Sequence, residues 1–267
     1  MKKTTLKITM AFLLAVCTLT GCGNSSSSDK KSDKKDKAET TTVAEDTTEK
    51  TTEEKTDEKT DEKTTEAEEE KTTANDSPSA AEGTDFKRGV VENNVYTNEF
   101  AGFKLNLTDD WKFLDDEMIN QVVNVGAGAT GSSNSEALAD YVNMTTITDA
   151  ICMNSKTNES VTITFENLNK NIMLSTDTTP EEYLEIANRQ FAALPSMKYT
   201  QTGDTTTVEI GGNEYIRALY DVEYNSLKYK QSYYIRRIGD FMNVMAVVSY
   251  NADEDLTAFE SNFSALD

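Results

Sequence analysis

Residues 205–250 read TTTVEI GGN EYIRALYDVEY NSL KYKQSYYIRRI GD FMNVMAVVSY, where the spaces separate four strand-like runs from three short connections. The runs are rich in β-branched and aromatic residues, which favour strands. The connections contain glycine or asparagine and are too short for a crossover helix. This segment therefore predicts an antiparallel meander of four strands.

The last run predicts the middle of a sheet, because both of its faces are apolar. One face carries Phe241, Met245 and Val247, and the other carries Met242, Val244, Ala246 and Val248. A strand of this kind is covered on both sides. We expect helices on each side, which makes the fold class α+β: an α/β/α sandwich with a central antiparallel sheet.

Helices are predicted before and after the meander. Thr179–Glu182 combines a capping box with proline at the first helical position. Asp115 and Asp116 are placed to cap a helix that ends at the glycine- and serine-rich break Gly126–Ser135. Apolar residues at helical spacing predict a final helix over 254–266, capped by Asp253.

Two pairs of strands are predicted upstream of the Thr179 helix. Val95–Thr97 and Phe103–Leu107 flank the turn 98–102, and Asp149–Asn154 and Val161–Phe165 flank a polar loop.

Several of these positions resemble the bacterial lipoprotein branch of the PsbP-like (Mog/PsbP-like) family, over most of residues 92–267. The family has an α/β/α sandwich, and its known members bind partners, one on photosystem II and one on a nuclear-transport GTPase. Thr108 and Asp110 depart from the pattern, where Pro and Gly are common. The resemblance implies a binding module and supplies no catalytic motif. It rests on Tyr96, Asn98, Phe100, Gly102, Phe103, Leu105, Leu107, Trp111 and Phe113, followed by the acid-capped helix and Val161–Leu168.

The N-terminus has the layout of a secretory signal peptide, with three lysines before the apolar run Ile8–Leu19. Leu19–Cys22 resembles the lipobox of bacterial lipoproteins, whose cysteine carries diacylglycerol after cleavage just before it. We therefore predict a signal peptide over 1–21 and lipid attachment at Cys22. The membrane is then a partner, and the protein is held on the outer face of the membrane of a Gram-positive bacterium. An ordinary signal peptide with a chance cysteine is the alternative.

Residues 22–85 are predicted to be the lipidated cysteine and a disordered tether. Residues 23–85 hold ten lysines and twenty acids but no aromatic residue, Leu, Ile or Met, so they cannot build a core. Aromatic residues become frequent at Phe86, which starts the predicted globular domain 86–267.

Composition excludes several functions. The chain of 267 residues has no histidine, three cysteines, and 26 Lys plus Arg against 47 Asp plus Glu, for a net charge of −21. Histidine-dependent catalysis, histidine-ligated metals and a disulfide scaffold are excluded. Nucleic-acid binding driven by phosphate neutralisation needs basic clusters, whereas acids outnumber basic residues about twofold in both 23–85 and 86–267, so this function is excluded. We expect no cofactor, no metal and a monomeric protein.

The sequence offers three carboxylate clusters as candidate chemistry: Asp109-Asp110, Asp115-Asp116-Glu117 and Asp253-Glu254-Asp255. Such clusters can bind calcium or act as acid/base pairs. Their places at predicted helix starts favour capping instead.

Other candidate sites are given structural interpretations. Tyrosines between 199 and 234 suggest an aromatic platform, but we favour a solvated sheet edge over 228–238. Within it, Tyr229 and Tyr233 share a face with Arg237, and Tyr234 shares the other with Lys228, Lys230 and Arg236. Cys152 is expected to be buried and structural, and Gly126–Gly128 lacks the Gly-Lys-Ser/Thr of a phosphate loop.

These patterns predict a non-enzymatic, membrane-anchored lipoprotein whose domain binds an extracytoplasmic protein or other ligand. No catalytic residue is predicted. The alternatives are a hydrolase of envelope polymers that uses a carboxylate pair, and a purely structural envelope protein.

Overall fold

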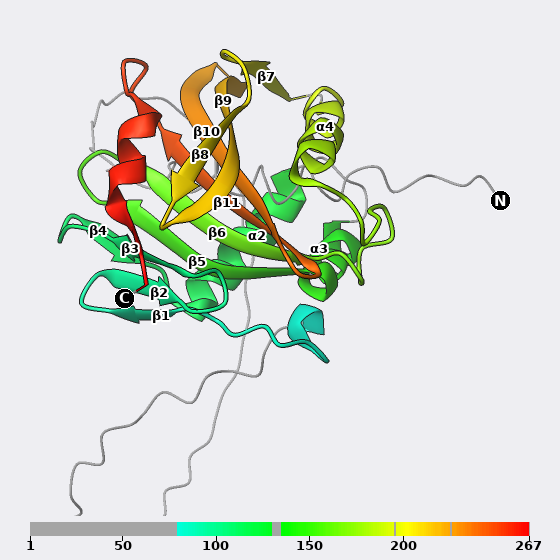
Figure 1. Cartoon of the computed structure of the whole chain (residues 1–267). Helices are drawn as coiled ribbons and strands as arrows, with labels where there is room; N and C mark the ends of the chain where they lie inside the picture. The colour runs from blue at the N-terminus through cyan, green and yellow to red at the C-terminus, as the bar shows by residue number, and fades with distance from the viewer. Residues whose placement is uncertain (1–78, 130–134, 195, 225, 267) are drawn as a thin grey trace, which may run out of the picture. The chain divides into compact units, whose positions relative to one another are not determined.

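The computed structural model describes residues 79–129, 135–194, 196–224 and 226–266 (Figure 1). The predicted signal peptide 1–21, Cys22 and the tether up to residue 78 lie outside the described residues.

The larger sheet has eight strands, all paired antiparallel, and contains the predicted meander. β11 lies between β6 and β10, and all nine of its residues are buried, which confirms its predicted central position. The sheet order is β4 (Trp111–Phe113), β5 (Thr146–Asn154), β6 (Ser160–Asn167), β11 (Phe241–Ser249), β10 (Leu227–Ile238), β9 (Asn213–Tyr224) and β7 (Met197–Gln201), with β8 (Thr206–Ile210) also paired to β9.

The smaller sheet has the order β1 (Val90–Glu92), β2 (Val95–Asn98), β3 (Phe103–Asn106) and β12 (Phe263–Ala265). Asn93 and Asn94 connect β1 to β2 with φ of 50° and 61°, as a two-residue type I′ hairpin requires. The predicted turn 98–102 is confirmed: the Asn98 side chain accepts a hydrogen bond from the Ala101 N–H at 2.7 Å.

Three α-helices are described: α2 (Asp116–Ala129), α3 (Ser135–Thr145) and α4 (Pro180–Phe191). The Thr179 hydroxyl and the Glu182 carboxylate form the predicted capping box of α4. Asp115 caps α2 by accepting from the Met118 N–H at 2.8 Å. The predicted break over Gly126–Ser135 starts too early, since α2 continues to Ala129, and it ends before Ser135, where α3 begins; a glycine costs a helix only about 1 kcal/mol, and residues 130–134 lie outside the described part.

The predicted final helix over 254–266 is wrong. A 3-10 helix, η2 (Leu256–Asn262), occupies its first half, and Phe263 then starts β12. Asp255, not Asp253, accepts from the Thr257 N–H and caps η2. The chain leaves the helix because the end of the domain pairs with β3 and completes the smaller sheet.

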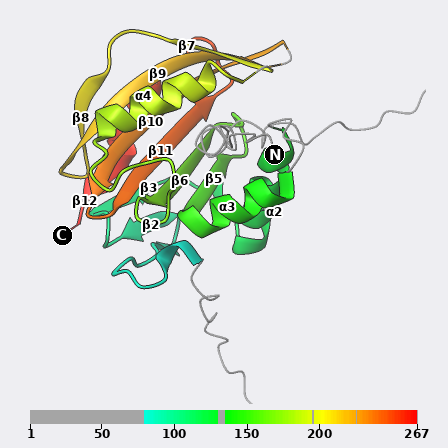
Figure 2. The ribbon, with the colours of Figure 1, turned by 90° about the vertical axis from the view of Figure 1, so that its right-hand side faces the viewer.

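The register of the larger sheet shows what covers each face. One row runs across it through Ile151, Thr162, Ala246, Tyr233 and Ala218, so these side chains point the same way. Ile151 packs with α2 and α3, and Tyr233 and Ala218 pack with α4, so all three helices lie on one face (Figure 2).

The opposite face packs against the smaller sheet and η2. Met245 and Tyr234 belong to the same core as Phe103 of β3 and Leu256 of η2. The structure confirms the predicted α+β class with a central antiparallel sheet. The cover of the second face is a β-sheet with a 3-10 helix, where the sequence led us to expect an α-helix.

The packed part of the chain begins before the predicted boundary at Phe86. Ser79–Ala81 forms a 3-10 helix, η1, whose Ala80 and Ala81 are buried in the core. The Asn167 side chain donates to the Ala80 carbonyl at 2.8 Å. Composition placed these residues in the tether because alanine carries no strong apolar signal.

A buried carboxylate, Asp149 of β5, joins the segment before β1 to the core. Its side chain is fully buried and accepts from the Arg88 guanidinium at 3.1 Å, the Gly89 N–H at 2.8 Å and the Asn98 amide at 2.9 Å. The Tyr96 hydroxyl also donates to it. A side chain at position 89 would collide with the Tyr96 ring, which explains the glycine there.

Candidate functional site

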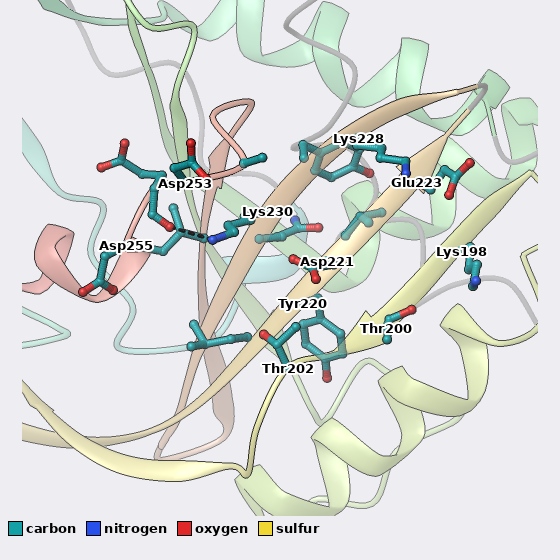
Figure 3. Close-up of a pocket in the computed structure, with 17 residues that line it drawn as sticks. Lys198, Thr200, Thr202, Tyr220, Asp221, Glu223, Lys228, Lys230, Asp253 and Asp255 are labelled. Carbon is teal, nitrogen blue, oxygen red and sulfur yellow. Dashed lines mark hydrogen bonds between the residues drawn. The ribbon is translucent and has the colours of Figure 1, made fainter.

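A groove of about 670 Å³ opens on the face of the larger sheet that carries the smaller sheet and η2 (Figure 3). Its floor is formed by β7, β9 and β10, and its wall by residues 252–255 of the loop after β11 together with Leu256, the first residue of η2. The volume falls within the roughly 300–1,000 Å³ typical of small-ligand sites.

The strand register places charged and hydroxyl side chains in rows across the floor. Glu223 of β9 lies between Lys198 of β7 and Lys228 of β10 in one row. In the next row, Asp221 lies between Thr200 and Lys230. Alternate residues of the same strands point into the helix-covered core, so period-two alternation builds a polar floor on an apolar layer.

The acidic wall is held in place by several contacts with the sheet. Lys230 donates to the backbone carbonyl of Glu254 at 3.0 Å, and Leu256 is buried in the core. Arg217 forms a partly buried ion pair with Glu260 of η2 at 2.6 Å. A partly buried ion pair stabilises a structure only when a close contact offsets the cost of removing both charges from water, as the short Arg217–Glu260 distance does here.

Charged side chains meet in the groove without pairing with one another. Lys198, Lys228, Asp221, Glu223 and Asp253 form no salt bridge in the described part of the chain, although they all line one cavity. Figure 3 shows Asp253 and Asp255 on one side of the groove and Lys198 on the other. Each of the five is free to contact a bound molecule.

The tyrosine-rich strands do not form an aromatic platform, and the prediction of a solvated edge over 228–238 is wrong. β10 is an interior strand, and Tyr229, Tyr233 and Tyr234 are 3%, 0% and 0% exposed. The rings pack into the two cores because the sheet is covered on both faces. Solvent reaches Lys228 and partly reaches Lys230, at the open end of the strand.

Two of the three carboxylate clusters serve local structure. Asp115 caps α2, Asp116 pairs with Arg88 at 2.9 Å, and Asp110 pairs with Lys156 at 2.9 Å. The third cluster, Asp253-Glu254-Asp255, forms the wall of the groove.

The remaining sequence candidates are structural. Cys152 is buried in the core, as predicted, and burial raises the pKa of its thiol. The three residues Gly126, Ala127 and Gly128 lie inside α2 and not in a phosphate-binding loop.

Glu166 of β6 is a second buried carboxyl group, and it lies beneath α4 on the face away from the groove. It accepts from the Tyr183 hydroxyl at 2.7 Å and from the Asn171 amide. Burial raises the pKa of Glu166 from 4.5 to about 7, although both hydrogen bonds act in the opposite direction.

The raised pKa of Glu166 predicts a specific pH dependence of stability. Glu166 loses its proton near pH 4.5 in the unfolded chain and near pH 7 in the native state. The protonated carboxyl therefore stabilises the native state fully below pH 4.5, and this stabilisation is lost as the pH rises to about 7. The free energy of unfolding of wild type, relative to that of Glu166→Gln, should therefore fall by about 3 kcal/mol as the pH rises across this window. Urea unfolding at several pH values measures it. Glu214→Gln, at an exposed position, is the control, and a difference for Glu166→Gln that is flat with pH would contradict the prediction.

Sequence reasoning missed β7 and the acids of β9. Lys198 and Thr200 alternate along β7 and Thr202 follows its end, and Asp221 and Glu223 alternate with buried residues along β9. This alternation of polar side chains was the available signal for a solvated floor. The sequence does not show that the loop after β11 lies beside the floor of the groove.

Comparisons with known proteins assign no family. No family model matches the chain, and no curated protein matches it. Among solved structures, LpqN, involved in cell envelope biogenesis of Mycobacterium tuberculosis, is similar at 12% identity and a TM-score of 0.34, over 62% of this chain and 83% of that one. A protein from Bacteroides thetaiotaomicron is similar at 10% identity and a TM-score of 0.33, over 67% of this chain and 48% of that one. The predicted PsbP-like membership stays a prediction.

Among the described residues, no helix is long and apolar enough to cross a membrane. No group of three or more His, Cys, Asp or Glu side chains within residues 79–266, apart from the undescribed positions, is placed to hold a metal ion.

Proposed function

We propose that this protein is a lipid-anchored, extracytoplasmic binding protein, attached to the membrane through Cys22 and binding its ligand in the groove. The observation that supports binding is the convergence of unpaired charged side chains from three strands and a loop on one cavity. The observations that support the location are the signal-peptide layout and the sequence Leu19–Cys22.

The proposal describes a monomeric, non-enzymatic module. The chain has no histidine to act as a general base, and the buried Glu166 carboxyl does not line the groove. A carrier or assembly role needs only shape and charge complementarity, and the charged lining of the groove supports such a role.

Acylation of lysines on intact cells, with a reagent that does not cross membranes, tests the proposal. Exposed lysines outside the groove, Lys87 and Lys112, are expected to react equally on cells and in purified protein. Lys198 and Lys228 are expected to react several-fold less on cells, because the bound ligand shields them.

A further inference from the structure

The groove's lining indicates the chemistry of its ligand. This inference rests on the proposed function and adds the ligand class to it. We propose that the groove binds a short peptide that carries a primary ammonium group and a carboxylate, with the ammonium at the wall and the carboxylate at the floor lysines.

The wall is suited to a cation. Asp253 is exposed and forms no ion pair in the described part of the chain, and Asp255, although it caps η2, is also exposed beside it. Lys230 approaches this wall, but its ammonium is bound to a backbone carbonyl and not to a wall carboxylate. The negative charges of the wall are therefore available to a ligand ammonium group.

The floor is suited to the other half of a zwitterion. It has three lysines against two carboxylates, and Lys198 and Lys228 are exposed and lack ion-pair partners among the described residues. The hydroxyls of Thr200 and Thr202 add donors and acceptors that suit peptide amide groups.

Other ligand classes fit less well. Glycan recognition commonly uses exposed aromatic faces, whereas the tyrosines that line this groove, Tyr220 and Tyr229, are 2% and 3% exposed. An apolar ligand would remove the charged groups of the groove from water without offering them a partner, which costs free energy. A polyanion would meet the acidic wall on a domain that carries thirteen basic and twenty-seven acidic residues from Phe86 onward.

Binding should be modest and sensitive to salt. Each exposed ion pair changes Kd by about fivefold at most, because water screens it. Two or three such contacts together therefore account for about a tenfold to hundredfold effect. Raising the ionic strength from about 0.01 M to about 1 M shortens the Debye length from about 30 Å to about 3 Å and should weaken binding.

Calorimetric titration of the purified full-length protein with glycyl-lysyl-glycine tests the ligand class. We expect saturable binding that weakens about tenfold when both amines of the peptide are acetylated. Amidation of its carboxyl terminus should weaken binding about fivefold. An acetylated peptide that binds as tightly as the free one would overturn the assignment of the ammonium site.

Matched variants locate the site. Asp253→Asn and Lys228→Ala should each weaken peptide binding about two- to fivefold, whereas Asp177→Asn and Lys87→Ala, at exposed positions outside the groove, should not. If the groove variants and the control variants changed the Kd of the peptide equally, the assignment of the binding site to the groove would be overturned.

The failure of this inference and that of the proposed function can be distinguished. Groove lysines that are shielded on cells, together with no peptide binding, would overturn the ligand class and leave the binding function standing. Groove lysines that react fully on cells, together with no peptide binding, would overturn both.

Discussion

Replacing Asp149 by alanine is expected to lower the free energy of unfolding by about 3–5 kcal/mol, since removing one partner of a buried ion pair leaves the other uncompensated. The carboxylate is fully buried and accepts hydrogen bonds from Arg88, Gly89, Asn98 and Tyr96. Alanine would leave donors on two chain segments, residues 88–89 and β2, without their acceptor. Urea unfolding measures the change.

The matched control is Asp110→Ala, which removes an ion pair of the same type at the surface. Lys156 and Asp110 are 70% and 39% exposed, so the loss should stay below about 1 kcal/mol. Similar small losses for both variants would show that Asp149 does not join the segment before β1 to the core.

Replacing Cys22 by alanine is expected to abolish incorporation of radiolabelled palmitate and to release the protein from the membrane fraction. One acyl chain binds a membrane only marginally, whereas two or more chains anchor a protein stably, at about 0.8 kcal/mol per buried methylene. Cys22 is the cysteine of the predicted lipobox, so its loss should remove all of the predicted anchor. Labelling of cells followed by fractionation measures both effects.

Cys17→Ala is the control for the anchor, because Cys17 lies within the predicted signal peptide and leaves with it. This variant should keep full labelling. Equal labelling of Cys22→Ala and wild type would refute the anchor and favour an ordinary signal peptide.

The sequence predicted most of the fold where local chemistry decides it. Runs of β-branched and aromatic residues between short glycine or asparagine connections located β9, β10 and β11, and the capping box at Thr179 located α4. The end of the chain was predicted wrongly because the spacing of Leu256, Phe259 and Phe263 suits a helix, while pairing with β3 decides the outcome. Tertiary pairing of this kind leaves no local signal.

The candidate site could be predicted only in parts. Asp253–Asp255 and the lysines of β10 were both recognised in the sequence, but as separate surface features. They line one groove because the chain after β11 turns back beside β10. The strand β7, which carries Lys198, was not predicted at all. The burial of the tyrosines depends on the cover that both sheet faces receive, which lies far away in sequence.

The acylation ratio of the groove lysines decides whether the groove holds a ligand at the cell surface. Mass spectrometry compares Lys198 and Lys228 with Lys87 and Lys112, on intact cells and in purified protein. We expect the two groove lysines to be protected several-fold on cells, while the two reference lysines react fully both on cells and in purified protein. Full reaction of the groove lysines on cells would contradict ligand binding, and protection of all four from the impermeant reagent would contradict the extracytoplasmic location.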